Sequence, residues 1–236
     1  MLSVVLSFKN ETSNSYFPKI IDSLSKIPSI DVVCVDGGST DGTAEKLDRT
    51  NFRVFSLPGN SRAARLNLGI KNCLNPWILL HHPRCLLSEE SVRNLVQRLP
   101  NYKPCWGGFT HRFDDHHPLL GFTSWYSTQI RLRFRKIAYL DHCPFFHKSL
   151  LDQHDSAPVP LLDIFEDTAW SQKMAKHSRP KILKEISQVS AVRFNKNGYY
   201  RQAALNQILK VGYGLGWSSE TMNKVYEKGL SLNAKY

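Results

Sequence analysis

The feature that most constrains the fold is the alternation of short apolar runs with segments of helical spacing in the first hundred residues. The runs Leu2–Phe8 and 31–35 are nearly continuous in apolar character, as is typical of strands covered on both faces. Between them, residues 16–27 carry apolar side chains at helical spacing. Strands that alternate with helices favour a parallel sheet with right-handed crossovers. The sequence therefore predicts an α/β fold, with a mostly parallel sheet flanked by helices.

The alternation continues along the chain and becomes less regular after residue 100. We expect further strands at 52–55, 77–80, 106–113 and 186–193. We expect further helices at 43–47, 63–73, 88–99, 125–138, 168–177 and 200–211. No repeat or low-complexity linker interrupts the sequence, so we expect one domain over residues 1–236 with a helical C-terminal segment.

Charge and cysteine content narrow the class of partner and compartment. The 31 Lys and Arg against 20 Asp and Glu give a net charge of +11, which favours a phosphate-bearing small molecule, a nucleic acid or an anionic membrane surface. An inert basic surface is the alternative. The five cysteines form no C-x-x-C pair, which is typical of a reducing compartment. With no secretory signal and no long apolar segment, we expect a cytoplasmic protein, at most peripheral at the inner face of the membrane.

The loop 35–43, Val-Asp-Gly-Gly-Ser-Thr-Asp-Gly-Thr, follows the second expected strand and predicts a nucleotide site. Ligands of parallel α/β sheets bind at the carboxyl ends of the strands, and Gly37 and Gly38 allow the backbone to approach a ligand. Ser39 or Thr40 is expected to cap the following helix, whose N–H groups favour an anion. Asp36 would accept a hydrogen bond from a base or a ribose hydroxyl. The glycine spacing matches neither a dinucleotide fingerprint nor a P-loop, and an ordinary strand-to-helix turn is the alternative.

Four ordered motifs resemble family 2 glycosyltransferases of the GT-A fold. They are Ser-Phe-Lys-Asn-Glu at 7–11, the loop 35–43, Arg-Ala-Ala-Arg-Leu-Asn-Leu-Gly at 62–69, and Glu-Asp at 166–167. The likeness is closest to a bacterial subgroup associated with radical-SAM and selenodomain proteins, with late support from Asp141, from 190–194 with Gly198, and from 201–213. The resemblance implies a nucleotide-binding half (1–100) and an acceptor half with C-terminal helices (101–236). It also implies transfer of a sugar from a nucleotide-sugar donor to an acceptor hydroxyl, usually with inversion.

The resemblance also implies roles for individual residues. The catalytic candidates are Asp167 and Glu166. Asp167 would be the general base, and its place at the start of a helix is expected to keep it ionised at neutral pH. A simple helix cap is the alternative. The nucleotide-binding candidates are Phe8, Glu11, Asp36, Gly38, Arg62, Asn67 and His81. The candidates for contacting the diphosphate or the acceptor are Arg84, Asp141 and Arg193.

The sequence departs from the family after the fourth expected strand. The family has a D-x-D-like carboxylate pair there for a divalent cation, whereas this chain reads His-His-Pro-Arg-Cys at 81–85. His81 is common in the close subgroup, but Pro83 has no side-chain ligand, and Mg²⁺ and Mn²⁺ prefer oxygen donors. We therefore predict no metal-ligating residue here, with a divalent cation, Mn²⁺ or Mg²⁺, as the less favoured alternative. Fixed cations would stabilise the diphosphate instead, with Arg84, Arg62, Arg65 and Arg193 as candidates. The alternative is an inactive protein that binds a nucleotide or a glycan.

Other polar clusters have less specific interpretations. The run Asp-Asp-His-His at 114–117 is expected to be a solvated loop rather than a metal site, and His142, His147 and His154 are expected at the surface or satisfied in the core. The basic, aromatic stretch 125–136 is expected either to lie on anionic lipid, which would suit a lipid-linked acceptor, or to be a solvated helix face. A glycan acceptor remains open. A nucleotidyltransferase would need a basic Gly-rich signature near the first strand, and no nucleic-acid recognition motif appears, so we expect no nucleic-acid partner.

Overall fold

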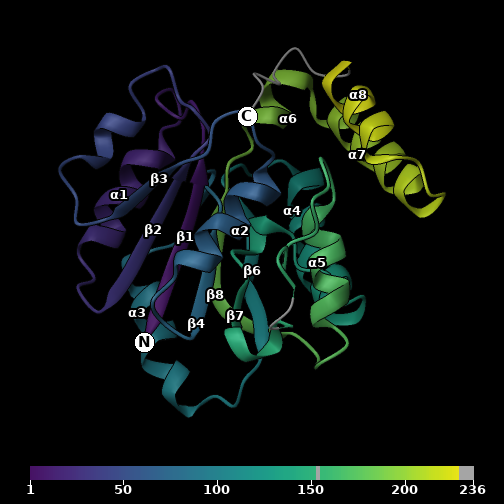
Figure 1. Cartoon of the computed structure of the whole chain (residues 1–236). Helices are drawn as coiled ribbons and strands as arrows, with labels where there is room; N and C mark the ends of the chain where they lie inside the picture. The colour runs from purple at the N-terminus through teal and green to yellow at the C-terminus, as the bar shows by residue number, and fades with distance from the viewer. Residues whose placement is uncertain (153–154, 229–236) are drawn as a thin grey trace.

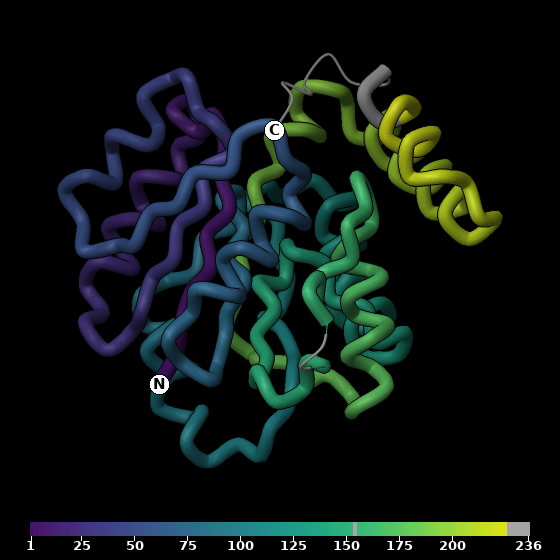
Figure 2. The backbone as a smooth tube through the Cα atoms, in the orientation of Figure 1, coloured from purple at the N-terminus to yellow at the C-terminus, as the bar shows by residue number. Residues whose placement is uncertain are grey.

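The centre of the fold is a group of parallel strands whose side chains are buried on both faces. In the computed structural model, which describes residues 1–152 and 155–228, β1 (Leu2–Phe8) pairs in parallel with β2 (Ile30–Asp36) and with β4 (Trp77–His81). β2 pairs in parallel with β3 (Arg53–Ser56). Figure 2 traces β1 upward from the N-terminus, so the carboxyl ends of these strands share one edge of the sheet.

The remaining strands extend the sheet with mixed directions. β7 (Phe145–His147) is antiparallel to β4 and to β6 (Trp106–Phe113), and β6 is parallel to β8 (Lys181–Val189). The short β5 (Cys85–Leu86) is antiparallel to β8. In the described part of the chain the sheet has eight strands in the order β3-β2-β1-β4-β7-β6-β8-β5. The expected α/β class with a mostly parallel sheet is confirmed.

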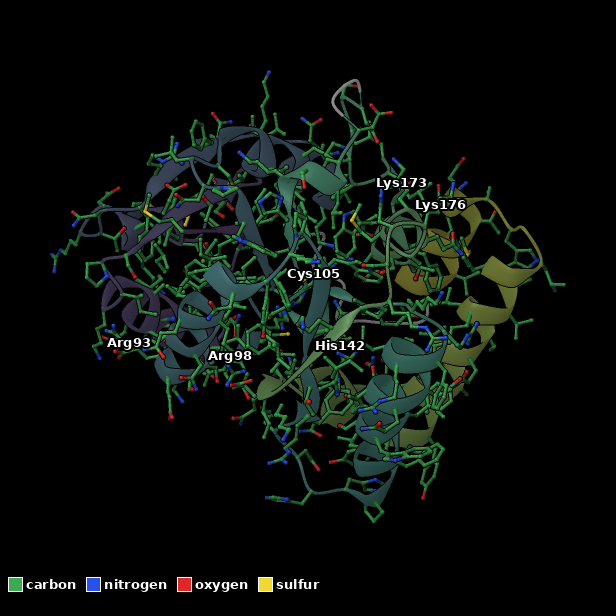
Figure 3. All side chains as sticks on the ribbon, turned by 90° about the horizontal axis from the view of Figure 1, so that it is seen from below. Arg93, Arg98, Cys105, His142, Lys173 and Lys176 are labelled. Atoms are coloured by element: carbon green, nitrogen blue, oxygen red, sulfur yellow. The ribbon has the colours of Figure 1, made fainter. Side chains whose placement is uncertain are left out.

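Helices cover both faces of the sheet and create two hydrophobic cores. On one face, Leu2, Val4 and Leu6 of β1 pack with α1 (Tyr16–Ser25) and α3 (Glu89–Arg98). On the other face, Val5 packs with α2 (Arg62–Asn72) and α5 (Glu166–Met174). Alternate residues of β1 thus serve different cores, which explains its unbroken apolar run. Figure 3 shows Arg93 and Arg98 on α3, and Lys173 and Lys176 at α5.

The C-terminal helices stand apart from the sheet. α7 (Tyr199–Gly214) and α8 (Ser219–Lys228) lie side by side, joined to the body through α6 (Val192–Asn197) (Figure 1). α4 (Pro118–Trp125) runs directly into η3 (Tyr126–Phe134), a π-helix. The short 3-10 segments are η1 (Ala44–Leu47), η2 (Leu99–Asn101), η4 (Leu140–His142) and η5 (Lys148–Leu150).

Three expectations about elements were wrong. The expected helix 43–47 is the single 3-10 turn η1, and the expected helix 125–138 is a helix end followed by the π-helix η3. The expected strand 186–193 begins earlier and ends at Val189, because the chain turns at Ser190 and Ala191 into α6. Arg193 is therefore helical. No helix in residues 1–152 and 155–228 is long and apolar enough to cross a membrane.

Candidate functional site

A cavity of about 620 Å³ opens at the carboxyl edge of the sheet. The start of α2, the loop after β4, η4, the start of α5, α6, α7 and η3 enclose it. Its cationic lining residues are Lys9, Arg62, Arg65, Arg84, Arg131, Arg193 and Lys210. Its carboxylate lining residues are Asp141, Asp163 and Asp167. Cations outnumber carboxylates, so the cavity suits an anionic ligand.

Asp167 is the carboxylate whose acidity the fold changes most clearly. It lies in the first turn of α5 and accepts a hydrogen bond from the Leu140 N–H at 3.1 Å. Burial and, to a smaller extent, the charge of Glu166 raise the pKa of Asp167 to about 7, with Arg62 opposing both. The expectation that the helix dipole keeps Asp167 ionised at neutral pH is wrong, because burial outweighs the dipole. A carboxyl with a pKa near neutrality suits proton transfer.

Glu166 holds Arg62 at the mouth of the cavity. The Arg62 Nε donates to Glu166 Oε1 at 2.5 Å, and the Glu166 side chain is 1% exposed. The second oxygen, Oε2, is buried and has no hydrogen-bond partner within the described chain. Glu166 does not line the cavity, so its place is behind Arg62 rather than in contact with a ligand.

The loop after β4 gathers arginines around a neutral imidazole. The His82 Nδ1 accepts a hydrogen bond from the Arg84 N–H at 3.1 Å. Burial lowers the pKa of His82 to about 3; Asp141 opposes this shift, and the positive charges of Arg62, Arg193 and Arg84 reinforce it. His82 is therefore uncharged at neutral pH, and three guanidinium groups lie close enough to repel a proton from it.

A buried network fixes Arg84 beneath the cavity. Glu11, which is fully buried, lies 3.6 Å from the Arg84 Nη2 through its Oε2. The Asn14 Nδ2 donates to the same Glu11 oxygen at 3.0 Å and to the Pro83 carbonyl at 2.6 Å. Burial raises the pKa of Glu11, while Arg84 and Asn14 lower it in part. Glu11 therefore supports Arg84 and the loop backbone and does not line the cavity.

The donor atoms near this loop do not fit a Mg²⁺ or Mn²⁺ site. The ligand atoms of His82, Cys85 and Asp141 lie within 4.8 Å of one another. Only Asp141 offers an oxygen, burial raises the pKa of the Cys85 thiol, and the His82 Nδ1 already accepts a hydrogen bond. Hard divalent cations prefer several oxygen ligands, and the neighbouring guanidinium groups oppose a further positive charge.

The Asp36 loop is closed by its own side chains. The Asp36 carboxylate accepts hydrogen bonds from the Ser39 N–H at 3.0 Å and from the Ser39 Oγ at 2.6 Å. Gly38 adopts φ +83°, and a Cβ there would lie 2.8 Å from the Cβ of Pro58. The expected cap of a following helix is wrong, because Ser39 bonds Asp36 and the one-turn η1 offers no α-helical N-terminus. The Asp36 side chain thus closes the turn by accepting from the backbone three residues on.

The predicted site residues separate into two groups. Arg62, Arg84, Asp141, Asp167 and Arg193 line the cavity together. Phe8, Glu11, Asp36, Gly38, Asn67, His81 and Glu166 do not. The nucleotide-binding role of this second group stays a prediction.

Individual positions explain the separation. Phe8 packs on Phe17 in the core with ring centroids 5.3 Å apart. Asn67 holds the backbone of Val159, donating from Nδ2 at 2.7 Å and accepting at Oδ1 at 2.9 Å. His81 is buried, and burial lowers its pKa to about 4.

Arg65 connects the Asp36 loop to the cavity. The Arg65 side chain donates to Ser7 Oγ at 3.0 Å and to the Asn60 carbonyl at 2.8 Å. A Cβ at Gly37 would lie 2.7 Å from the Arg65 Nη1, so the glycine leaves room for this guanidinium. Arg65 thus contacts the end of β1 and the loop after β2, and it also lines the cavity.

Three cavity cations, Lys9, Arg131 and Lys210, were given no role at the site from the sequence. Arg131 was expected on a basic surface face, but it is 6% exposed because η3 turns it inward. Lys210, on α7, was not singled out. The wider turn of a π-helix, with its i→i+5 hydrogen bonds, does not show in an α-helical pattern, so no sequence signal identified Arg131.

The remaining polar clusters are structural. The Asp114 Oδ1 accepts from the Ala191 N–H at 2.8 Å, and the Asp115 Oδ2 accepts from the Tyr199 hydroxyl at 2.8 Å, so this loop anchors the start of α6 and α7. His142 is satisfied in the core by the Phe109 carbonyl and Ser127 Oγ (Figure 3). His147 is half-buried, and His154 lies outside the described residues.

Comparisons with solved structures support the fold. S. aureus TarS 1–349 in complex with UDP-GlcNAc has a TM-score of 0.63 and 20% identity, covering 80% of this chain and 58% of that one. Full S. aureus TarS has a TM-score of 0.61 and 17% identity over 97% of this chain and 42% of its own. Glucosyl-3-phosphoglycerate synthase from Mycobacterium tuberculosis, in complex with Mn²⁺, UDP and glucosyl-3-phosphoglycerate, has a TM-score of 0.54 and 14% identity over 80% and 71%.

This chain thus spans 58% and 42% of the length of these two TarS chains. A search of curated protein sequences finds no match. The model of the family described as glycosyl transferase family 2 matches residues 3–154, which include the β1, β2 and β4 loops and the Arg62 helix. The chain therefore belongs to glycosyl transferase family 2.

Proposed function

We propose that this chain transfers a sugar from a uridine diphosphate sugar to an acceptor hydroxyl with inversion. The observation that carries the proposal is the position of Asp167, whose pKa is about 7, on a cavity that Arg62, Arg84 and Arg193 also line. Transfer needs a proton acceptor beside a site for a diphosphate leaving group, and the cavity offers both. Uridine is the first base to test because TarS and the mycobacterial synthase were solved with UDP ligands.

In the proposed reaction, the acceptor oxygen attacks the anomeric carbon of the donor while Asp167 removes the acceptor proton. The bond between the anomeric carbon and the phosphate oxygen breaks, and its electron pair leaves with the nucleoside diphosphate. Attack and departure occur on opposite faces of the sugar, so the configuration inverts. The guanidinium groups of Arg62, Arg84 and Arg193 stabilise the negative charge that develops on the leaving diphosphate.

The proposed leaving-group stabilisation does not use a divalent cation. Its basis is the donor set around His82, where Pro83 replaces a carboxylate and three guanidinium groups supply positive charge. The test measures UDP release from a panel of UDP-sugars after treatment with excess EDTA. Rates that survive EDTA support the proposal, and rates lost to EDTA and restored by Mn²⁺ contradict it.

The second candidate is an inactive protein that binds a nucleotide or a glycan, and Pro83 is the feature that favours it. A thermal-shift screen of nucleotide sugars, with and without Mn²⁺, separates the two when paired with the release assay. Stabilisation by a UDP-sugar without any UDP release favours the binding protein. UDP release that Asp167→Asn removes favours the transferase.

Finer parts of the proposal rest on sequence motifs. They are a single domain over 1–236 with nucleotide and acceptor halves, membership of the radical-SAM/selenodomain-associated subgroup, and a cytoplasmic location. The acceptor is a glycan or a lipid-linked molecule, and no nucleic acid takes part.

A peripheral membrane contact is proposed for the outer side of α4 and η3. Phe122, Trp125 and Phe134 are 60%, 53% and 71% exposed there, beside exposed Arg133 and Arg135. Exposed aromatic and basic side chains on one helix favour anionic lipid interfaces. Co-sedimentation with anionic but not zwitterionic liposomes, reduced by Phe134→Ser, supports the contact, and binding to neither contradicts it.

A further inference from the structure

The cations of the cavity form two separate groups. Arg62, Arg84 and Arg193 surround His82 at the end of β4. Arg131 on η3 lies close enough to His111 of β6 and to Lys210 of α7 for its charge to lower the pKa of both. β7 separates β4 from β6 in the sheet, whereas the Asp36 loop follows β2 on the opposite side of β4. The Arg131–Lys210 group is therefore on the side of the cavity away from the proposed nucleoside site.

Arg131 is held rigidly in this second group. The Arg131 Nη1 donates to Ser127 Oγ at 3.1 Å, and the guanidinium carbon lies 4.1 Å from the centroid of the Tyr139 ring. The side chain is 6% exposed. No carboxylate of the described residues forms an ion pair with it. A buried guanidinium without a carboxylate partner carries an uncompensated charge.

Lys210 adds a second uncompensated charge next to the first. Burial, together with the charges of Arg131 and Arg135, lowers its pKa to about 8. Among the residues that the structure describes, the Lys210 amine has no hydrogen bond to a side chain or carbonyl and no ion pair, although it lines the cavity. Holding two cations together without an anion destabilises the fold, and a bound anion would relieve this repulsion.

The group lies beside the proposed base. Tyr139 is in contact with Arg131, and its pKa, raised mainly by burial, also responds to the charge of Asp167. Leu140, the next residue, donates its N–H to Asp167. A molecule whose hydroxyl reaches Asp167 would thus place a neighbouring group near Arg131 and Lys210.

We propose that Arg131 and Lys210 form an oxyanion subsite for the acceptor, so that the acceptor carries a phosphate or a carboxylate near the hydroxyl that receives the sugar. The inference rests on the proposed function only in identifying the bound molecule as the acceptor. Binding of an anion by Arg131 and Lys210 can be tested independently. Arginine supplies paired donors for an oxyanion, and lysine supplies a point charge.

The test uses the thermal midpoint of the full chain with inorganic phosphate or acetate, against chloride at matched ionic strength and with UDP present to occupy the diphosphate side. The variant is Lys210→Gln. The control is Lys176→Gln, which makes the same charge change at an exposed residue just after α5 that does not line the cavity (Figure 3).

We expect phosphate or acetate to raise the midpoint of the wild type and of Lys176→Gln by about 2 °C or more, and that of Lys210→Gln by less than half as much. The more effective anion indicates which oxyanion the acceptor carries. No rise in the wild type with either anion, or an equal rise in Lys210→Gln, overturns the subsite.

A separate reading of the UDP effect distinguishes the two proposals. If UDP stabilises the wild type and Lys210→Gln equally while the anion effect is absent, the subsite fails and nucleotide binding stands. If UDP stabilises neither protein but the anion effect depends on Lys210, nucleotide binding fails and the subsite stands.

Discussion

Replacing Glu166 with glutamine should move the pH dependence of turnover to lower pH. Burial raises the pKa of Asp167 to about 7, and the charge of Glu166 contributes to the rise. In Glu166→Gln that negative charge is gone, while the positive charge of Arg62, which lowers the pKa of Asp167, remains. Because a general base acts when deprotonated, a lower pKa extends activity to more acidic solution.

The size of the effect follows from the titration of one carboxyl. With a pKa of about 7, Asp167 is about 9% ionised at pH 6 and about 91% at pH 8, so wild-type kcat/KM at pH 6 should be about one tenth of its value at pH 8. Removing the negative charge of the neighbouring Glu166 should lower the pKa of Asp167 by about one unit, or about 1.4 kcal/mol. The variant would then be about half ionised at pH 6, a roughly fivefold gain relative to its own plateau.

The assay is UDP release from a UDP-sugar between pH 5.5 and 9, in buffers of constant ionic strength, with each profile normalised to its own plateau because the loss of the Arg62 partner also affects the maximum. The control is Asp163→Asn, which removes an exposed cavity carboxylate that is not among the main causes of the Asp167 shift. An acid limb that stays near pH 7 in Glu166→Gln, or that moves equally in Asp163→Asn, refutes the reasoning.

Three further predictions concern stability and the roles of individual residues. Asp167→Asn should raise the free energy of unfolding by about 2–4 kcal/mol at pH 8 but little at pH 4. The reason is that the raised pKa of Asp167 makes the folded wild type lose stability as pH rises from about 4 through 7, whereas asparagine does not titrate. Urea titrations at both pH values measure this, and equal effects would contradict it. Gly38→Ala should lower the free energy of unfolding by about 1–3 kcal/mol because of its φ of +83° and the contact with Pro58, whereas Gly121→Ala, in open space on α4, should be neutral or stabilising. Asn67→Ala should lower the free energy of unfolding by about 1–3 kcal/mol through the two lost hydrogen bonds to Val159. It should leave UDP affinity within about twofold, because Asn67 does not line the cavity. A large loss of UDP affinity at unchanged stability would support the predicted nucleotide-binding role instead.

The first hundred residues were predictable because β1, β2 and β4 are buried on both faces. The apolar runs of β1 and β2 and the helical spacing of α1 and α2 follow directly from the two cores that they build. The short pairings of β5 and β7 leave no such signal, since two or three residues have no measurable period. The helical position of Arg193 was also missed, because α6 is short and begins only one residue before it, at Val192, directly after the turn that ends β8.

The sequence identified several residues that line the candidate site but not their pKa values or contacts. Arg62, Arg84, Asp141, Asp167 and Arg193, which the motifs singled out, line one cavity in the structure, and their roles stay predictions. The sequence could not show that burial raises the pKa of Asp167, or that Glu11 turns away to support Arg84, because both depend on packing between distant segments. Arg131 escaped notice because a π-helix changes which residues face inward.

The most direct test of the account compares UDP release from a UDP-sugar by the wild type and by Asp167→Asn, each in excess EDTA at pH 8. The account predicts that the wild type retains its rate in EDTA and that Asp167→Asn loses about 10²-fold or more while still binding UDP. A wild-type rate abolished by EDTA and restored by Mn²⁺, or an Asp167→Asn rate equal to that of the wild type, would contradict it.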